Sequence, residues 1–193
     1  MYIVVEGIDT CGKSTQIELL ASAYPQAIIT KEPGATELGA KIRELVLFSD
    51  GLCSVTELLL FLADRSNHVS SVIQPNLGKL IISDRSLISG MAYALASKKF
   101  DFEWLETLNR FAMQEIMPDA IILFQIQEET LRERLGGKSH DVIEQRGIEY
   151  MLDVQKQLAF VAKKLGIKTL LIKAEDSIEE IQTHINNFIG KQL

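Results

Sequence analysis

Eight residues near the start of the chain constrain its fold more than any other feature. They are Gly7-Ile8-Asp9-Thr10-Cys11-Gly12-Lys13-Ser14, and they match the phosphate-binding pattern G-x-x-x-x-G-K-[ST] at every fixed position. An apolar run at 2–5 comes directly before them, and a helix-like stretch follows at 15–21. Because this motif requires a strand before the glycine loop and a helix after it, the sequence predicts a phosphate-binding loop that opens an α/β domain.

The residue types in this loop explain how it would hold a polyphosphate. Gly7 and Gly12 let the backbone curl so that its N–H groups converge, and the following helix points its positive dipole end at the same place. Lys13 would reach the β- and γ-phosphates, and Ser14 would ligate Mg²⁺. The alternative is a chance glycine turn beside a surface lysine, and the flanking strand and helix count against it.

The rest of the chain alternates between apolar runs and amphipathic stretches. The further strand-like runs are 27–30, 80–83, 120–124 and 169–172. The helix-like segments are 13–23, 36–47, 54–77, 87–97, 101–116, 128–135, 144–165 and 177–190. This alternation predicts a single α/β domain over 1–193, a five-stranded parallel sheet flanked by helices on both faces. Ligands would then bind beyond the carboxyl ends of the strands.

Charge and composition exclude several classes of partner. The net charge of −6 argues against a general nucleic-acid-binding surface, so any anionic ligand must be held by local cationic groups. No segment approaches the roughly 20 apolar residues of a membrane span. The two cysteines, Cys11 and Cys53, form no metal-binding pattern, and one lies in the phosphate loop. A reducing, cytoplasmic location is therefore expected.

Two pairs of residues suggest binding of a metal ion, a phosphate group or a nucleic base. Asp84 and Arg85 follow the third apolar run, where an acidic residue would hold Mg²⁺ and an arginine would clamp phosphate; a structural salt bridge is the alternative. Phe61 and Arg65 share one helix face, and a ring beside a guanidinium suits a nucleic base. A core phenylalanine beside a salt-bridged arginine is the alternative there.

Basic residues surround a glycine-containing stretch late in the chain. Arg134, Lys138 and Arg146 lie within the segment 134–147. Phosphoryl transfer needs positive charge over the transferred group and exclusion of water, and a basic lid over this segment would supply both. An exposed charged helix is the alternative.

Together these motifs resemble those of thymidylate kinases, in the same order and over nearly the whole chain. They are Glu6 to Asp9 with Lys13 to Gln16, Glu32-Pro33-Gly34-Ala35-Thr36, Phe61-Leu62-Ala63-Asp64-Arg65, Asp84-Arg85-Ser86 with Ser89, and Ala92-Tyr93. The resemblance implies a P-loop fold of the nucleoside monophosphate kinase type with a small lid. It also implies a homodimer that packs through helices such as 54–77, and transfer of the ATP γ-phosphoryl group to dTMP with Mg²⁺.

The resemblance also assigns roles to residues. The ATP-binding residues would be Gly7, Ile8, Asp9, Thr10, Cys11, Gly12, Lys13, Ser14 and Thr15. The dTMP-binding residues would be Asp9, Pro33, Arg43, Phe61, Arg65, Arg85 and Tyr93. Asp9 would bond the sugar 3′-hydroxyl, Phe61 would stack on thymine, and Arg65 would read a thymine carbonyl. Pro33 would line the nucleoside pocket, and Tyr93 would lie beneath the sugar. Arg43 and Arg85 would hold the dTMP phosphate, while Ser14 and Asp84 would hold Mg²⁺.

The chain departs from the family pattern at several positions. Thr10 stands where some members carry a basic residue, so the catalytic cation should come from the lid. Val142 occupies the position of the usual lid arginine, and Arg134, Lys138 or Arg146 would substitute for it. Gly90 and Ala94 replace polar residues near the base, so Arg65 would carry more of the recognition.

Two other functions fit parts of the pattern. Another P-loop nucleotide or deoxynucleoside kinase is the nearest alternative, although a monophosphate kinase needs the extra phosphate-binding arginines that Arg43 and Arg85 provide. A non-catalytic nucleotide-binding module is disfavoured because Lys13, Asp84 and Arg85 are all present. A switch GTPase is disfavoured because the chain has no Asn-Lys-x-Asp motif.

Overall fold

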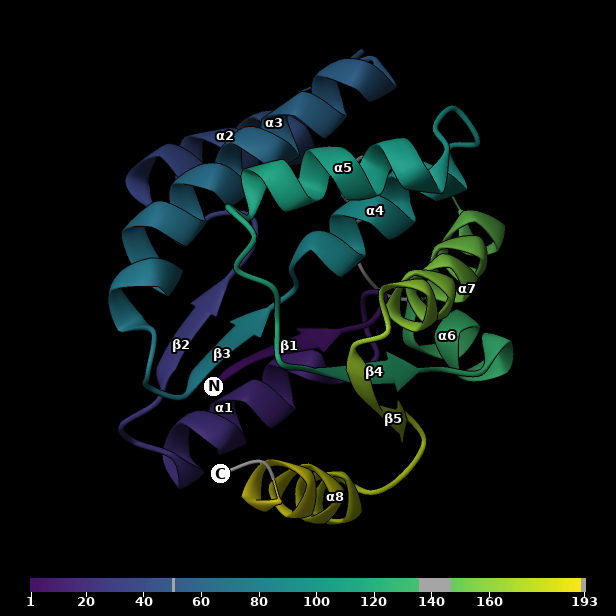
Figure 1. The fold of residues 1–193 in the computed structure, drawn as a ribbon. Helices are drawn as coiled ribbons and strands as arrows, with labels where there is room; N and C mark the ends of the chain where they lie inside the picture. The colour runs from purple at the N-terminus through teal and green to yellow at the C-terminus, as the bar shows by residue number, and fades with distance from the viewer. Residues whose placement is uncertain (50, 136–146, 192–193) are drawn as a thin grey trace.

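The computed structural model describes residues 1–49, 51–135 and 147–191. The strands are β1 (Tyr2–Glu6), β2 (Ile28–Lys31), β3 (Ile81–Asp84), β4 (Ala120–Gln125) and β5 (Lys168–Lys173). They form one parallel sheet in the order β2-β3-β1-β4-β5 (Figure 1). This confirms the predicted five-stranded sheet, and each strand lies within one residue of the segment expected from the sequence.

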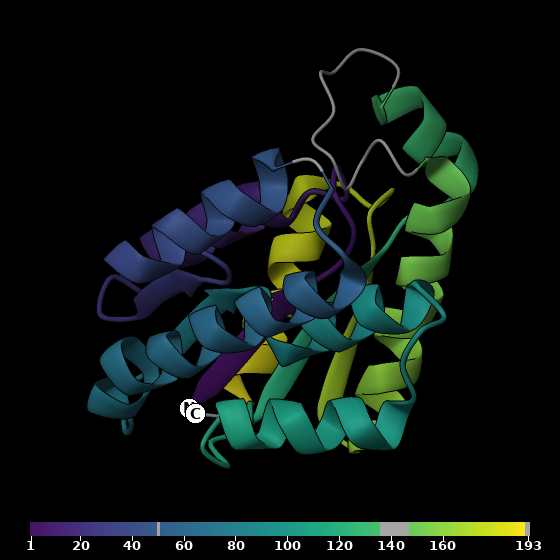
Figure 2. The same ribbon diagram turned by 90° about the horizontal axis from the view of Figure 1, so that it is seen from above.

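The helices cover both faces of this sheet. They are α1 (Lys13–Ala23), α2 (Glu37–Phe48), α3 (Ser54–His68), α4 (Leu87–Ala96), α5 (Phe102–Ala112), α6 (Glu128–Leu135), α7 (Ile148–Leu165) and α8 (Ile178–Gly190). Helices α1 and α8 lie on one face, and α4, α5 and α7 lie on the other (Figure 1). Seen from above, α2 and α3 lie to one side of the molecule, and α6 and α7 lie to the other (Figure 2).

The prediction of one long helix over 54–77 is wrong for its last part. Helix α3 ends at His68, and the chain continues as a π-helical turn, η1 (Val69–Ile73), and a 3₁₀ turn, η2 (Gln74–Asn76). Pro75 lies in this last turn. A proline has no N–H group and disfavours α-helical geometry in the residue before it, so regular helix cannot continue there.

The centre of the sheet explains the continuous apolar runs in the sequence. Ile3, Val4 and Val5 of β1 are 0 % exposed because β1 lies between β3 and β4 with helices on both faces. Strands buried on both faces are uniformly apolar rather than alternating.

Parallel register brings the functional motifs to one edge of the sheet. Val5 of β1 and Lys31 of β2 both lie opposite Asp84 of β3. The phosphate loop, the Glu32-Pro33-Gly34 turn and the Asp84-Arg85 pair therefore leave the sheet side by side, at the carboxyl ends where ligands of such sheets bind.

Candidate active site

The phosphate loop leads directly into α1. Gly12 is the N-cap of this helix with φ +96°, and no side chain in the described part of the chain caps the helix. An L-residue with a side chain is strained at that dihedral angle. The first N–H groups of α1 therefore remain without a side-chain acceptor at a site suited to an anion.

A polar cavity opens over the loop and the start of α1. It is lined by Asp9, Thr10, Gly12, Lys13, Ser14, Thr15, Lys31, Glu32, Arg43, Asp84 and Arg85. Six of the nine positions predicted to bind ATP are in this lining, whereas Gly7, Ile8 and Cys11 are buried instead. Lys13 is buried to 6 % exposure, and its Nζ donates to the Ile8 carbonyl at 2.8 Å. Four cationic side chains, those of Lys13, Lys31, Arg43 and Arg85, line this cavity and are suited to binding phosphate groups.

Asp84 carries the feature most suggestive of a cation. Its Oδ1 is buried and has no hydrogen-bond partner among the described residues, and Asp84 lines the same cavity as Ser14 and Lys13. An unpartnered carboxylate oxygen in the same cavity as a serine suits Mg²⁺, which prefers oxygen ligands. Within residues 1–49, 51–135 and 147–191, no group of three His, Cys, Asp or Glu side chains could hold a metal. Phosphate and water would therefore complete the coordination.

Arg85 is fixed at the junction between β3 and α4. Its Nη2 lies 2.6 Å from Asp9 Oδ1, and its Nη1 donates to the Gly7 carbonyl at 3.0 Å and to Ser89 Oγ at 3.2 Å. The guanidinium carbon lies 5.7 Å from the centre of the Tyr93 ring. Arg85 pairs with Asp9 rather than forming the Asp84 salt bridge that was the structural alternative.

The charge state of Asp9 follows from this contact. Burial disfavours its ionised form, but Arg85 and then Lys13 outweigh burial and lower the pKa of Asp9 below its ordinary value. Asp9 is therefore a carboxylate that can accept hydrogen bonds at neutral pH.

A second cavity adjoins the first. It is lined by Asp9, Glu32, Pro33, Arg43, Leu47, Phe61, Arg65, Arg85, Ser86, Ser89, Gly90 and Tyr93. All seven positions predicted to bind dTMP are in this lining. Asp9, Glu32, Arg43 and Arg85 line both cavities, so these four residues form the boundary between them.

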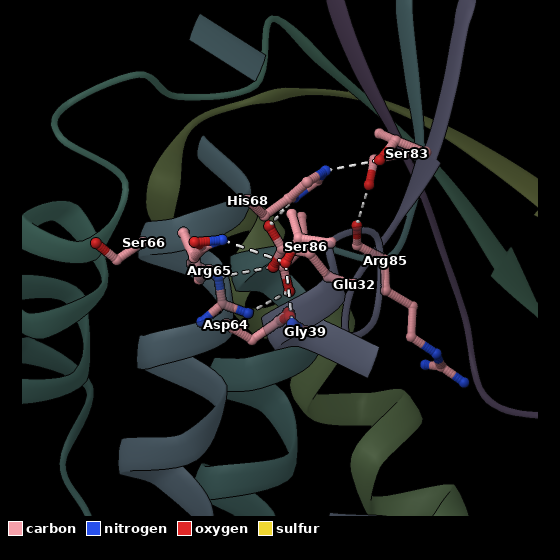
Figure 3. A network of polar contacts seen from close by, with 12 residues as sticks. Glu32, Gly39, Asp64, Arg65, Ser66, His68, Ser83, Arg85 and Ser86 are labelled. Atoms are coloured by element: carbon pink, nitrogen blue, oxygen red, sulfur yellow. Dashed lines mark hydrogen bonds and ion pairs between the residues drawn. The ribbon is translucent and has the colours of Figure 1, made fainter. Parts of the chain in front are cut away.

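Arg65 lines this second cavity, yet its side chain is only 2 % exposed. Its Nε donates to Glu32 Oε2 at 2.9 Å, its Nη1 to Asn109 Oδ1 at 2.7 Å, and its Nη2 to the Ser86 carbonyl at 3.1 Å. Figure 3 shows Arg65, Glu32 and His68 gathered together, whereas the guanidinium of Arg85 points away from this group. The two interpretations of Arg65 from the sequence are therefore compatible, because the side chain forms a salt bridge and lines the cavity in the same conformation.

His68 supports the carboxylate that holds Arg65. Its Nδ1 lies 2.8 Å from Glu32 Oε1, and its Nε2 lies 2.7 Å from Thr30 Oγ1. Burial raises the pKa of Glu32, but Arg65 and His68 outweigh burial and the net pKa is lowered. Glu32 is therefore held ionised although it is 3 % exposed.

Gly90 faces the terminal nitrogens of Arg65. A Cβ built on Gly90 would lie 2.8 Å from Arg65 Nη2 and 3.0 Å from Nη1. These distances are shorter than ordinary van der Waals contact, and Arg65 is held by three acceptors. A side chain at position 90 would therefore have to displace the Arg65 guanidinium, and glycine avoids this contact.

The sequence reasoning missed Glu6 as a site residue. Glu6 is fully buried and accepts hydrogen bonds from the hydroxyl groups of Ser86, at 2.7 Å, and Ser89. Burial raises the pKa of its carboxyl group. Because Ser89 bonds Arg85 and the Ser86 carbonyl bonds Arg65, Glu6 braces both arginines. Glu6 belongs to the motif that carries the family resemblance, but the sequence predicts no role of its own for it.

Asp64 holds the turn that follows β2. It is 1 % exposed, and its Oδ1 accepts from the Gly34 N–H at 3.3 Å. Arg43 Nη1 donates to the Pro33 carbonyl of the same turn at 3.2 Å. Burial, followed by the nearby Glu32 carboxylate, raises the pKa of Asp64 to about 6.

Of the predicted lid residues, only Arg134 is described. Its Nη1 donates to the Thr10 carbonyl at 3.1 Å and its Nη2 to the Ala174 carbonyl at 2.9 Å. It therefore lies against the phosphate loop. Lys138, Val142 and Arg146 lie outside the described residues.

The fold and the two joined cavities define a P-loop nucleotide kinase. A sequence model of the family described as thymidylate kinase matches residues 5–185. The thymidylate kinase of Wolinella succinogenes is 51 % identical over 185 residues, which cover 96 % of each chain. That of a Sulfurovum species is 52 % identical over 190 residues, covering 98 % of this chain and 99 % of the relative.

A solved structure agrees with these sequence matches. The thymidylate kinase crystal structure from Ehrlichia chaffeensis has a TM-score of 0.80 and 26 % identity, with 98 % of each chain covered. The chain belongs to the thymidylate kinase family, enzymes that use ATP as co-substrate. The family expected from the motifs is thereby confirmed. In the described part of the chain, no helix is both long enough and apolar enough to cross a bilayer.

We predict that Gly90→Ala destabilises the protein, although alanine normally favours a helix over glycine by ~1 kcal/mol. The added methyl group meets a guanidinium that cannot move freely, and such overpacking costs about 1–3 kcal/mol. Chemical denaturation should show a lower free energy of unfolding. Gly190→Ala at the end of α8 is the control because a Cβ there meets no atom of the described residues within 4 Å. Equal stability of the Gly90 variant and the wild type would contradict the packing argument.

We predict that Asp64→Asn raises stability above pH 6. The raised pKa of Asp64, about 6, means that the folded state binds a proton more tightly than the unfolded state. Wild-type stability therefore falls as pH rises from about 4 to about 6 and stays lower above that. Asparagine avoids this penalty and keeps an acceptor for Gly34, so the gain should be on the order of 1 kcal/mol at pH 7.5 and shrink toward pH 4.

Denaturation at several pH values checks this expectation. Asp176→Asn, at an exposed position, is the control for removing one negative charge. A gain from Asp64→Asn that is constant between pH 4 and pH 7.5 would show that titration of Asp64 is not its source.

Proposed function

We propose that this protein transfers the γ-phosphoryl group of ATP to dTMP, giving dTDP and ADP. The observation that carries the proposal is the junction of two cavities at Asp9 and Arg85. One cavity is built on the phosphate loop, and the other is lined by the aromatic and basic residues that suit a pyrimidine monophosphate. A donor and an acceptor phosphate placed in these cavities would meet beside Arg85. Family membership supports the same substrates.

On the donor side, the residues would provide alignment and positive charge. Phosphoryl transfer depends mainly on these two contributions. The N–H groups at the start of α1 and the ammonium group of Lys13 would bind the ATP phosphates, which requires Lys13 to exchange the Ile8 carbonyl for phosphate oxygens. Ser14 and Asp84 would hold Mg²⁺, and the unpartnered Asp84 oxygen supports this assignment. When bound, Mg²⁺ would neutralise charge on the transferring phosphate oxygens.

On the acceptor side, the second cavity would orient dTMP. Arg43 and Arg85 would bind its phosphate, and Asp9 would accept a hydrogen bond from the sugar 3′-hydroxyl. Phe61 would stack on the base while Arg65 donates to a thymine carbonyl. The attacking group is a phosphate oxygen that is largely deprotonated at neutral pH, so no general base is needed. Tyr93, whose ring lies near Arg85, would contact the sugar.

The lid would complete the positive charge over the transferred group. We propose a single domain with a lid at about 134–147, in which Arg134, Lys138 or Arg146 supplies this charge. Arg134 is supported by its contact with the Thr10 carbonyl in the phosphate loop. A cytoplasmic location fits the same proposal because the reaction consumes ATP.

A homodimer is the proposed assembly. Apolar side chains remain exposed on the outer helices: Val55 and Leu59 on α3 are 50 % and 57 % exposed, and Phe111 on α5 is 82 % exposed. Val55 and Leu59 are four residues apart and share a helix face. Burying these groups against a second copy would remove apolar surface from water.

The acceptor specificity tests the function directly. We predict that ADP forms from MgATP with dTMP far faster than with dUMP, dCMP, dGMP, AMP or thymidine. Lys13→Ala should reduce turnover by ~10²-fold or more because a donor to the transferring phosphates is lost. Lys41→Ala, at an exposed position on α2, is the matched control. A preference for another acceptor would contradict dTMP as the substrate. No transfer to any acceptor would favour a nucleotide-binding module.

The assembly proposal has its own test. We predict that the wild type sediments as a dimer at micromolar concentration and that Leu59→Glu sediments as a monomer, since a charge would be placed in the apolar interface. Leu171→Glu is the control because Leu171 is similarly exposed, at 59 %, but lies on the edge strand β5 rather than on α3. A monomeric wild type would refute the dimer.

A further inference from the structure

Arg65 is held more tightly than binding to a substrate alone would require. A guanidinium has five N–H donors in one plane and no acceptor. Glu32, Asn109 and the Ser86 carbonyl take one N–H each, from Nε, Nη1 and Nη2 respectively. One N–H on each terminal nitrogen is left for another acceptor. Both terminal nitrogens lie within 3.0 Å of the position that a Cβ of Gly90 would occupy, so the missing side chain opens them toward the second cavity.

Asn109 is the least expected of the three acceptors. It lies on α5, it is 0 % exposed, and it lines neither of the two joined cavities. Its Nδ2 donates to the Leu105 carbonyl at 2.8 Å while its Oδ1 accepts from Arg65 at 2.7 Å. Reversing the amide would place N–H donors against the guanidinium and an oxygen against a carbonyl. The amide therefore has one favourable orientation, and in that orientation it fixes Arg65.

We infer that Asn109 is a specificity-positioning residue, which directs Arg65 to accept a pyrimidine with a carbonyl at position 4 and to reject one with an amino group there. This inference rests on the proposed function. Arg65 can only donate, so a 4-amino group facing it leaves buried donors unpaired, and a site built to bond one group rejects its analogue strongly. That rejection requires a guanidinium that cannot turn away, and Asn109 removes this freedom.

The role of Asn109 differs from that of Glu32. Glu32 supplies the opposite charge, and the pair would be costly to break because a buried charge would remain uncompensated. Asn109 is neutral, so its removal leaves the ion pair in place and frees only the Nη1 end of the guanidinium. Substitutions at Asn109 should therefore affect the orientation of Arg65 more than its retention in the site.

The test compares dTMP with 5-methyl-dCMP, which differ at position 4 of the base and in whether the neighbouring N3 carries a hydrogen. The measured quantity is the ratio of kcat/KM for dTMP to kcat/KM for 5-methyl-dCMP. Asn109→Leu should lower this ratio by about tenfold or more, because a hydrogen bond that orients a buried charge is lost, and the KM for ATP should not change. Asn109→Asp keeps the Oδ1 acceptor for Arg65, so its ratio should stay closer to that of the wild type than the ratio of Asn109→Leu does, although its second oxygen would face the Leu105 carbonyl and lower stability.

Two further variants separate specificity from stability. Asn109→Ser is small enough to be accommodated if leucine prevents folding, and its short side chain cannot reach Arg65, so the same fall in the ratio is expected. Leu105→Ala removes a fully buried side chain one turn earlier on α5; it should lower the unfolding temperature and leave the ratio unchanged. An unchanged ratio in Asn109→Ser, or an equal fall in Leu105→Ala, would overturn the inference. A wild type that does not phosphorylate dTMP would instead refute the proposed function.

Discussion

The buried ion pair of Glu32 and Arg65 is the interaction on which the rest of the site depends. Both side chains are at most 3 % exposed, and their charged atoms lie 2.9 Å apart. Removing water from two charges is costly, so such a pair persists only when its remaining polar groups are also bonded. His68, Asn109 and the Ser86 carbonyl supply those bonds. The turn after β2 and helices α3, α4 and α5 are thereby fixed relative to one another at the second cavity.

A second buried carboxylate organises the phosphate side in the same way. Glu6 bonds the hydroxyl groups of Ser86 and Ser89, and Ser89 in turn bonds Arg85. Ser86 thus joins the two networks, because its hydroxyl donates to Glu6 while its carbonyl accepts from Arg65. Residues that would contact substrate are positioned by residues that would not. Such preorganisation lets charged groups act without rearranging as the reaction proceeds.

The fold was predictable from the sequence because its signals are local. The phosphate loop, the apolar runs and the alternation of strand and helix each lie within a few neighbouring residues, and all five strands were found. The second cavity was predictable from the family resemblance. Asn109, His68 and Glu6 were not, because their importance comes from contacts to residues distant in the chain, such as 44 positions between Arg65 and Asn109. The end of α3 was missed because η1 and η2 continue its helical turns as far as Asn76.

Gly90 departs from the family pattern, and the position of Arg65 gives this departure a structural explanation. Considered alone, it removes a polar group from the neighbourhood of the base and suggests weaker recognition. In the structure, the space of its missing side chain is adjacent to both terminal nitrogens of Arg65. A larger residue would have to displace a guanidinium that three acceptors hold. Under the proposed function, recognition of the base would therefore move from a side chain on α4 to the arginine on α3, and its accuracy would depend on the buried groups that hold that arginine.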